Sequence, residues 1–239
     1  MGRVLVLAIA SALVVTGCGG DSRAEVTNVK VYFLRGDKVW PVAREISANN
    51  DIEALADALV NGPTDQERAE LGLESALPAS TIFTGGQVSD DAVATVTFAD
   101  ATSLSFAAGA QIVYTMTAIP SVDSVDLFGV DPYTRADFEQ HTPSVLIESP
   151  LPFEEVDTPL RVTGTANTFE ANFQYELLDS AGNVVDENFV TATSGTGTRG
   201  TFEFTTADFD DVAALVVFES SAEDGSRIHE VEIPLDPAP

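Results

Sequence analysis

The chain has 239 residues, of which 44% are hydrophobic, 21% charged and 8% aromatic, a composition that excludes an intrinsically disordered chain. Lys and Arg total 11 against 38 Asp and Glu, so the formal net charge is −27. A chain this acidic repels phosphate backbones, which excludes nucleic acid as a partner.

The N-terminus has the pattern of a bacterial secretion signal. Residues 1–3 form a short, positively charged segment, and residues 4–15 are a run of apolar and small residues. This run is too short to span a bilayer, for which ~20 residues are needed. The following Val15-Thr16-Gly17-Cys18 resembles the bacterial lipobox. The resemblance implies cleavage after Gly17 and lipidation of Cys18, with acyl chains such as palmitate. We therefore expect residues 1–17 to be a lipoprotein signal peptide and residues 18–27 a lipidated tether. The mature protein is then expected at the extracytoplasmic face of the cell membrane.

Residues 28–130 mix strand and helix patterns. A turn at residues 35–38 lies between two β-rich runs and predicts a hairpin. Cap signals at Asn50 and at Thr64 with Glu67 predict two helix starts. In chain order we expect strands at 31–34 and 39–42, helices at 50–61 and 64–72, strands at 81–83 and 92–98, a helix at 106–119 and a strand at 125–127. This order predicts an α+β domain, with helices packed on a mixed or antiparallel sheet.

After residue 143 the helical period disappears, and short β-type runs alternate with turn signals. The runs are 145–149, 160–166, 171–178, 184–192, 201–205, 213–220 and 227–233. Seven such strands within residues 143–236 predict an all-β sandwich of immunoglobulin type. Residues 131–142, which have turn residues and poor periodicity, are the expected linker.

Two groups of stretches carry a family resemblance. In the first half they are 31–34, 59–64, 76–78, 94–96 and 111–117, and in the second half 147–150, 160–166, 169–172, 200–202 and 224–225. The first half resembles the GerMN domain, the sporulation and spore germination module of bacterial envelope proteins. The second half resembles the immunoglobulin-like domain of bacterial spore germination proteins, which often follows it.

The resemblance implies a non-enzymatic binding or assembly module of the cell envelope, with no catalytic, cofactor or metal residues to transfer. The implied partner is an envelope protein or the cell wall, and self-association is a further option because GerMN modules are similar to ring-building motifs. Two other classes remain as alternatives. A carboxylate-dependent cell-wall hydrolase needs two carboxyl groups about 5–10 Å apart. An extracellular solute-binding protein needs a sizeable apolar pocket with converging polar groups.

Several motifs have a functional interpretation that their context does not favour. Residues 195–200 spell Gly-x-Gly-x-x-Gly, but a dinucleotide site needs a helix after the glycines, and here a strand pattern follows. Arg35-Gly36-Asp37 matches an adhesion tripeptide, yet it lies where a hairpin needs a turn. His141 and His229 each stand without a nearby Cys or second His, so both are expected at the surface.

The predicted lipid anchor can be tested by changing one atom, the sulfur of Cys18. Replacing Cys18 with Ser removes the thiol that a thioether-linked lipid requires, so Cys18→Ser should remain unprocessed or be released from the membrane. Fractionation after a high-salt wash measures this. A Ser variant that stays with the membranes at the wild-type level would show that the lipobox interpretation is wrong.

Overall fold

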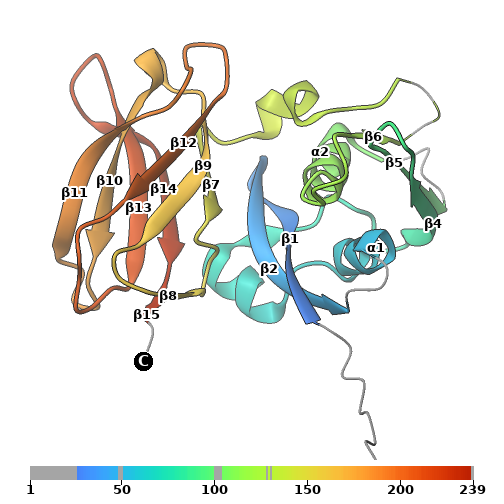
Figure 1. Cartoon of the computed structure of the whole chain (residues 1–239), viewed down its shortest axis with the longest axis horizontal. Coiled ribbons are helices and arrows are strands. Elements are labelled where there is room, and N and C mark those ends of the chain that lie inside the picture. Colours follow the sequence, from blue (N-terminus) through green and yellow to red (C-terminus); the bar gives the residue numbers. More distant parts are fainter. Residues whose placement is uncertain (1–25, 48–50, 100–103, 128, 130, 238–239) are drawn as a thin grey trace, which may run out of the picture.

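The computed structural model describes residues 26–47, 51–99, 104–127, 129 and 131–237, and Figure 1 shows two halves side by side. The expected signal peptide, Cys18 and the helix cap at Asn50 lie outside the described residues. Within those residues, none of the helices combines the length and apolarity that a bilayer crossing requires.

The N-terminal half is α+β, as predicted. Its strands are β1 (Val26–Arg35), β2 (Lys38–Ser47), β3 (Leu73–Glu74), β4 (Ile82–Val88), β5 (Val93–Ala99) and β6 (Ser124–Asp126). Its helical segments are α1 (Asp51–Asn61), the π-helical turn η1 (Glu67–Leu71) and α2 (Phe106–Met116). The predicted hairpin is present: Arg35 pairs with Lys38, and Gly36 turns the chain with φ at +62°. Thr64 and Glu67 also form the predicted cap, since each backbone N–H donates to the other side chain.

The expected single sheet is divided into two, with order β2-β1-β3 in one and β4-β5-β6 in the other. The helices lie between these sheets: α2 contacts β1 and β6, and α1 contacts β2 and β4 (Figure 1). The reason lies in α2, which is buried continuously from Ala108 to Met116. A helix that is buried on all sides needs cover on more than one side, and one sheet cannot supply it.

The segment expected to be a linker is packed against the N-terminal half. Tyr133 forms a β-bridge with Val125, and η3 (Arg135–His141) is a 3-10 helix that contacts α2. Phe138 is 1% exposed. A Cβ on Gly109 of α2 would lie 3.1 Å from the Phe138 ring, so the glycine allows the ring to approach the helix. The poor periodicity of residues 131–142 is therefore explained by a short 3-10 helix that is anchored by one buried side chain, Phe138.

The C-terminal half is the predicted all-β sandwich. Its two sheets have the orders β12-β9-β7 and β11-β10-β13-β14. These strands are β7 (Val145–Ser149), β9 (Arg161–Ala166), β10 (Asn172–Leu178), β11 (Val184–Thr191), β12 (Gly200–Thr205), β13 (Ala214–Ser220) and β14 (Arg227–Pro234). Aromatic rings from the two sheets meet in the core, with Phe173 and Phe202 centroids 4.7 Å apart and Tyr175 and Phe204 centroids 4.4 Å apart. The short strands β8 (Glu155–Val156) and β15 (Asp236–Pro237) pair in parallel beside the sandwich, and η4 (Phe169–Ala171) precedes β10.

Phe138 should contribute strongly to stability. Phe138→Ala leaves a cavity beside Gly109, so we expect a loss of about 3 kcal/mol in the free energy of unfolding, measured by urea denaturation. Ile82→Ala on β4 is the matched control, because Ile82 is 61% exposed and its truncation should change little. Equal effects of the two substitutions would contradict the packing described for η3.

Candidate functional site

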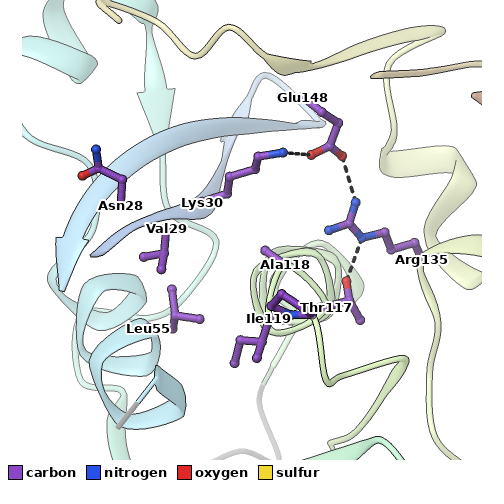
Figure 2. Close-up of a pocket in the computed structure, with 10 residues that line it drawn as sticks. Asn28, Val29, Lys30, Leu55, Thr117, Ala118, Ile119, Arg135 and Glu148 are labelled. Atoms are coloured by element: carbon purple, nitrogen blue, oxygen red, sulfur yellow. Dashed lines mark hydrogen bonds and ion pairs between the residues drawn. The ribbon is translucent and has the colours of Figure 1, made fainter. Parts of the chain in front are cut away.

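A largely buried carboxylate lies where the two halves meet. Glu148 projects from β7 of the sandwich, and its side chain is 13% exposed. Lys30 of β1 donates to Glu148 Oε2 at 3.0 Å, and Arg135 of η3 donates to Oε1 at 2.8 Å (Figure 2). The Tyr32 hydroxyl donates to Oε2 at 2.5 Å. One carboxylate from the sandwich is therefore held by two cations and a phenol from the preceding half and the connecting segment.

Local structure places each of these partners. Lys30 and Tyr32 are two residues apart in β1, so both side chains leave the same face of the strand. Arg135 begins η3, where its Nε donates to Thr117 Oγ1 at 2.7 Å and its Nη2 donates to the Tyr114 carbonyl at 3.1 Å. That carbonyl belongs to the last turn of α2, where a cation is favoured by the helix dipole.

The electrostatics keep Glu148 ionised. Burial by itself would raise the pKa of the Glu148 carboxyl, but the charges of Arg135 and Lys30 outweigh it and hold the pKa below its ordinary value. Burial and then the charge of Glu148 raise the pKa of the Tyr32 hydroxyl well above its ordinary value. Tyr32 therefore keeps its proton and remains a hydrogen-bond donor to the carboxylate.

A pocket of about 560 Å³ opens beside this cluster, between β1, α1 and the end of α2 (Figure 2). One side is apolar and the other polar. Its lining residues are Asn28, Val29, Lys30, Leu55, Thr117, Ala118, Ile119, Pro120, Arg135 and Glu148. The volume suits a small molecule, and Lys30, whose side chain is 34% exposed, is the cation accessible to it. Glu148 is the one carboxyl group in this lining, whereas a glycoside hydrolase mechanism needs two.

A second ion pair links the connecting segment to the sandwich. Arg199 forms two hydrogen bonds with Glu139 of η3, Nε to Oε2 at 2.9 Å and Nη2 to Oε1 at 3.0 Å. Arg199 Nη2 also donates to the carbonyl of Pro143 at 2.8 Å, and Asn167 donates to Glu139 at 2.8 Å. Arg199 belongs to the glycine-rich loop 195–200, which leads into β12 rather than into a helix. The loop therefore serves the contact between the halves.

The two histidines lie apart from this cluster. His141 Nδ1 is 2.8 Å from the carbonyl of Asp37, and His229 Nδ1 is 2.7 Å from Glu219 Oε1. In the described part of the chain, His, Cys, Asp and Glu side chains form no group of three that could hold a metal ion. Cys18, the one site residue predicted from the sequence, lies outside the described residues, so its lipidation stays a prediction.

Sequence reasoning missed Glu148 and Arg135 as a cluster. The available signals were Glu148, which directly follows the apolar run 145–147 at the start of the sandwich, and Lys30, one of the two lysines of the chain, which precedes the predicted strand 31–34. Neither signal reveals that Lys30 and Glu148 meet, because they are 118 positions apart in the sequence.

Fold and contacts together define a two-domain protein in which an α+β unit is fixed to an immunoglobulin-like sandwich. Residues 30–131 match the family described as sporulation and spore germination, and residues 144–226 match the immunoglobulin-like domain of bacterial spore germination. The chain therefore carries both domains in this order and is a protein of the spore-germination type, as its resemblance implied. Neither family description names an enzymatic activity.

Among solved structures, the tandem GerMN domains of the sporulation protein GerM from Bacillus subtilis match with 23% sequence identity and a TM-score of 0.36. The match covers 46% of this chain and 41% of that chain, less than half of either. No curated protein matches the chain.

Glu148→Gln tests the energetic role of the cluster. Gln leaves Lys30 and Arg135 without their buried counter-charge, so we expect the free energy of unfolding at neutral pH to fall by about 3 kcal/mol. Because the folded pKa of Glu148 lies below its ordinary value of 4.5, the stabilisation is present above that value and is lost as pH falls through the folded pKa. The difference between wild type and variant should therefore shrink in acid.

The control is Glu203→Gln, which breaks the exposed Arg161–Glu203 pair on the sandwich and should leave the melting temperature nearly unchanged. Calorimetry from about pH 7 down to pH 3 measures both variants. A difference between wild type and Glu148→Gln that stays constant over this range would contradict the ionised, paired state of Glu148.

Proposed function

We propose that the chain is a non-enzymatic binding or assembly module, tethered to the extracytoplasmic face of the cell membrane through lipid on Cys18. In this proposal residues 28–130 and 143–236 are its two domains, and residues 131–142 connect them. The sporulation and germination domains support the broad class. The single observation that supports an assembly role is the buried Glu148, which ties the two domains together.

A fixed arrangement of domains matters for binding. A flexible two-domain chain loses orientational freedom when it binds through both domains, and this loss weakens the complex. Glu148 and Glu139 each accept hydrogen bonds across the boundary, so the chain presents its two domains in one arrangement before any partner arrives. This preorganisation is a property that a scaffold needs and that a simple tether does not.

A second candidate function, a receptor for a small extracellular solute, is supported by the pocket beside Lys30. The pocket of about 560 Å³ beside Lys30 combines an apolar side with a cation, as a receptor for a small extracellular solute requires. A small amphipathic molecule with an acceptor group for Lys30 is the ligand that this lining favours. The carboxylate-dependent hydrolase is less favoured, because the pocket lining contains a single carboxyl group.

In-cell crosslinking tests the assembly role. Intact cells that express the full chain are treated with a short crosslinker, and crosslinked species are compared between wild type and Cys18→Ser. We expect discrete larger species with wild type and fewer with Cys18→Ser, because the anchor concentrates the protein at the surface. Purified protein is also incubated with isolated cell walls as a control for activity.

Two outcomes would overturn the proposal. Release of cell-wall fragments that Glu148→Gln abolishes would favour the hydrolase. Absence of any crosslinked species, together with a small molecule that co-purifies with the chain, would favour the solute receptor.

A further inference from the structure

Exposed aromatic side chains gather on the sandwich, far from the domain boundary. Phe189 of β11 is 72% exposed and Phe169 of η4 is 63% exposed. Both line one shallow hollow of about 160 Å³, and Phe189 also lines a neighbouring hollow of about 260 Å³. Strand β11 is an edge strand of the four-stranded sheet and lies on the side of the sandwich away from the N-terminal domain (Figure 1). Large exposed aromatic rings of this kind mark interaction surfaces.

The same sheet face already holds one aromatic ring under an arginine. The Arg227 guanidinium lies 4.2 Å from the ring centroid of Phe218 on β13. Arg227 also forms two hydrogen bonds with Glu176 on β10, one of them 2.9 Å from Nη1 to Oε2. The covered ring of Phe218 is only 5% exposed. An arginine stacked on an aromatic ring and paired with a carboxylate is therefore a stable arrangement on this face.

Strand β11 offers a second carboxylate and a second aromatic ring, Glu187 and Phe189, beside Glu176 and Phe218. Gln174 of β10 pairs with Phe218 on one side and with Phe189 on the other. Glu187 pairs with Glu176, and Glu187 is two residues from Phe189, so both side chains share one face of β11. Among the described residues no cation stacks on Phe189 and none forms an ion pair with Glu187, although the charge of Arg227 also acts on Glu187. The hollow of about 260 Å³ lies between Phe189, Glu187, Glu176 and Phe218.

We propose that this hollow binds an arginine side chain from a basic partner polypeptide. The guanidinium would stack on Phe189 and pair with Glu187, as Arg227 does with Phe218 and Glu176, and an apolar neighbour in the partner would cover Phe169. Arginine fits better than lysine because its planar guanidinium can stack and donate two parallel hydrogen bonds. The inference rests on the proposed binding role, and it specifies the chemistry of the partner.

Two observations decide between this occupant and others. Pairing β11 with β11 of a second copy would bring Asp186 and Glu187 of both copies together, and like charges facing each other across strands are destabilising. The net charge of −27 adds to this repulsion. The Phe189 backbone N–H already donates to Asn188 Oδ1 at 2.9 Å, so the edge is less open to an added strand than the face is to a side chain.

The probe is a blocked five-residue peptide, Gly-Arg-Val-Arg-Gly, and its control is the same peptide with citrulline, which has the shape of arginine without the charge. Binding to the purified full chain is measured by titration calorimetry and by amide chemical shifts. We expect the arginine peptide to bind, with shifts confined to β10, β11 and β13, and to weaken as salt rises. Phe189→Ser and Glu187→Gln should each weaken binding about fivefold.

Ile82→Ser removes an apolar side chain that is 61% exposed on the other domain and should leave peptide binding unchanged. Equal binding of the citrulline peptide, binding that Phe189→Ser leaves intact, or no binding at all would each overturn the proposal. A dimer in sedimentation that Phe189→Ser dissociates would show that a second copy occupies the face instead. Since in-cell crosslinking reports whether any partner exists, its result is independent of whether that partner is basic.

Discussion

A carboxylate that is nearly removed from water must be neutralised where it lies, and Glu148 achieves this only with residues from outside its own domain. Lys30, Tyr32 and Arg135 supply the counter-charges and hydrogen bonds. Separating the domains would return Glu148 to water but would break all of these contacts together, because they converge on one group. The burial of a single charge therefore fixes the relative orientation of two folding units that are each small enough to have moved independently.

Because the chain has few cations, those used in these buried contacts leave few Lys and Arg to neutralise the carboxylates on the surface. The chain has only 11 Lys and Arg for 38 acids, and several of them are used inside the structure. Arg44 pairs with Glu67, Arg199 with Glu139, and Lys30 and Arg135 share Glu148. The carboxylates left outside these pairs give the protein an acidic exterior. Such an exterior favours cationic partners through long-range attraction, and it opposes contact between identical copies.

Local patterns in the sequence were sufficient for most of the elements. Short β-type runs separated by turn signals predicted the seven sandwich strands, and the Thr64–Glu67 cap and the turn at Gly36 formed where the sequence predicted. These features depend on neighbours within a few residues, so they can be deduced from the chain alone. The short strand β3 and the 3-10 helix η3 were not predicted. The two residues of β3 form a strand only because they pair with β1, and η3 is held by the burial of Phe138 against α2.

The sequence by itself determined the fold class, the order of the two domains and the family, and it predicts a lipid anchor at Cys18. Only the tertiary structure decided that the N-terminal domain has two sheets, that Lys30 and Arg135 meet Glu148, and that Phe189 and Glu187 stand beside Phe218 and Glu176. The reason is the range of the interactions. Caps and strand alternation act between residues close in sequence, whereas Lys30 and Glu148 are 118 positions apart and come together only when the domains pack.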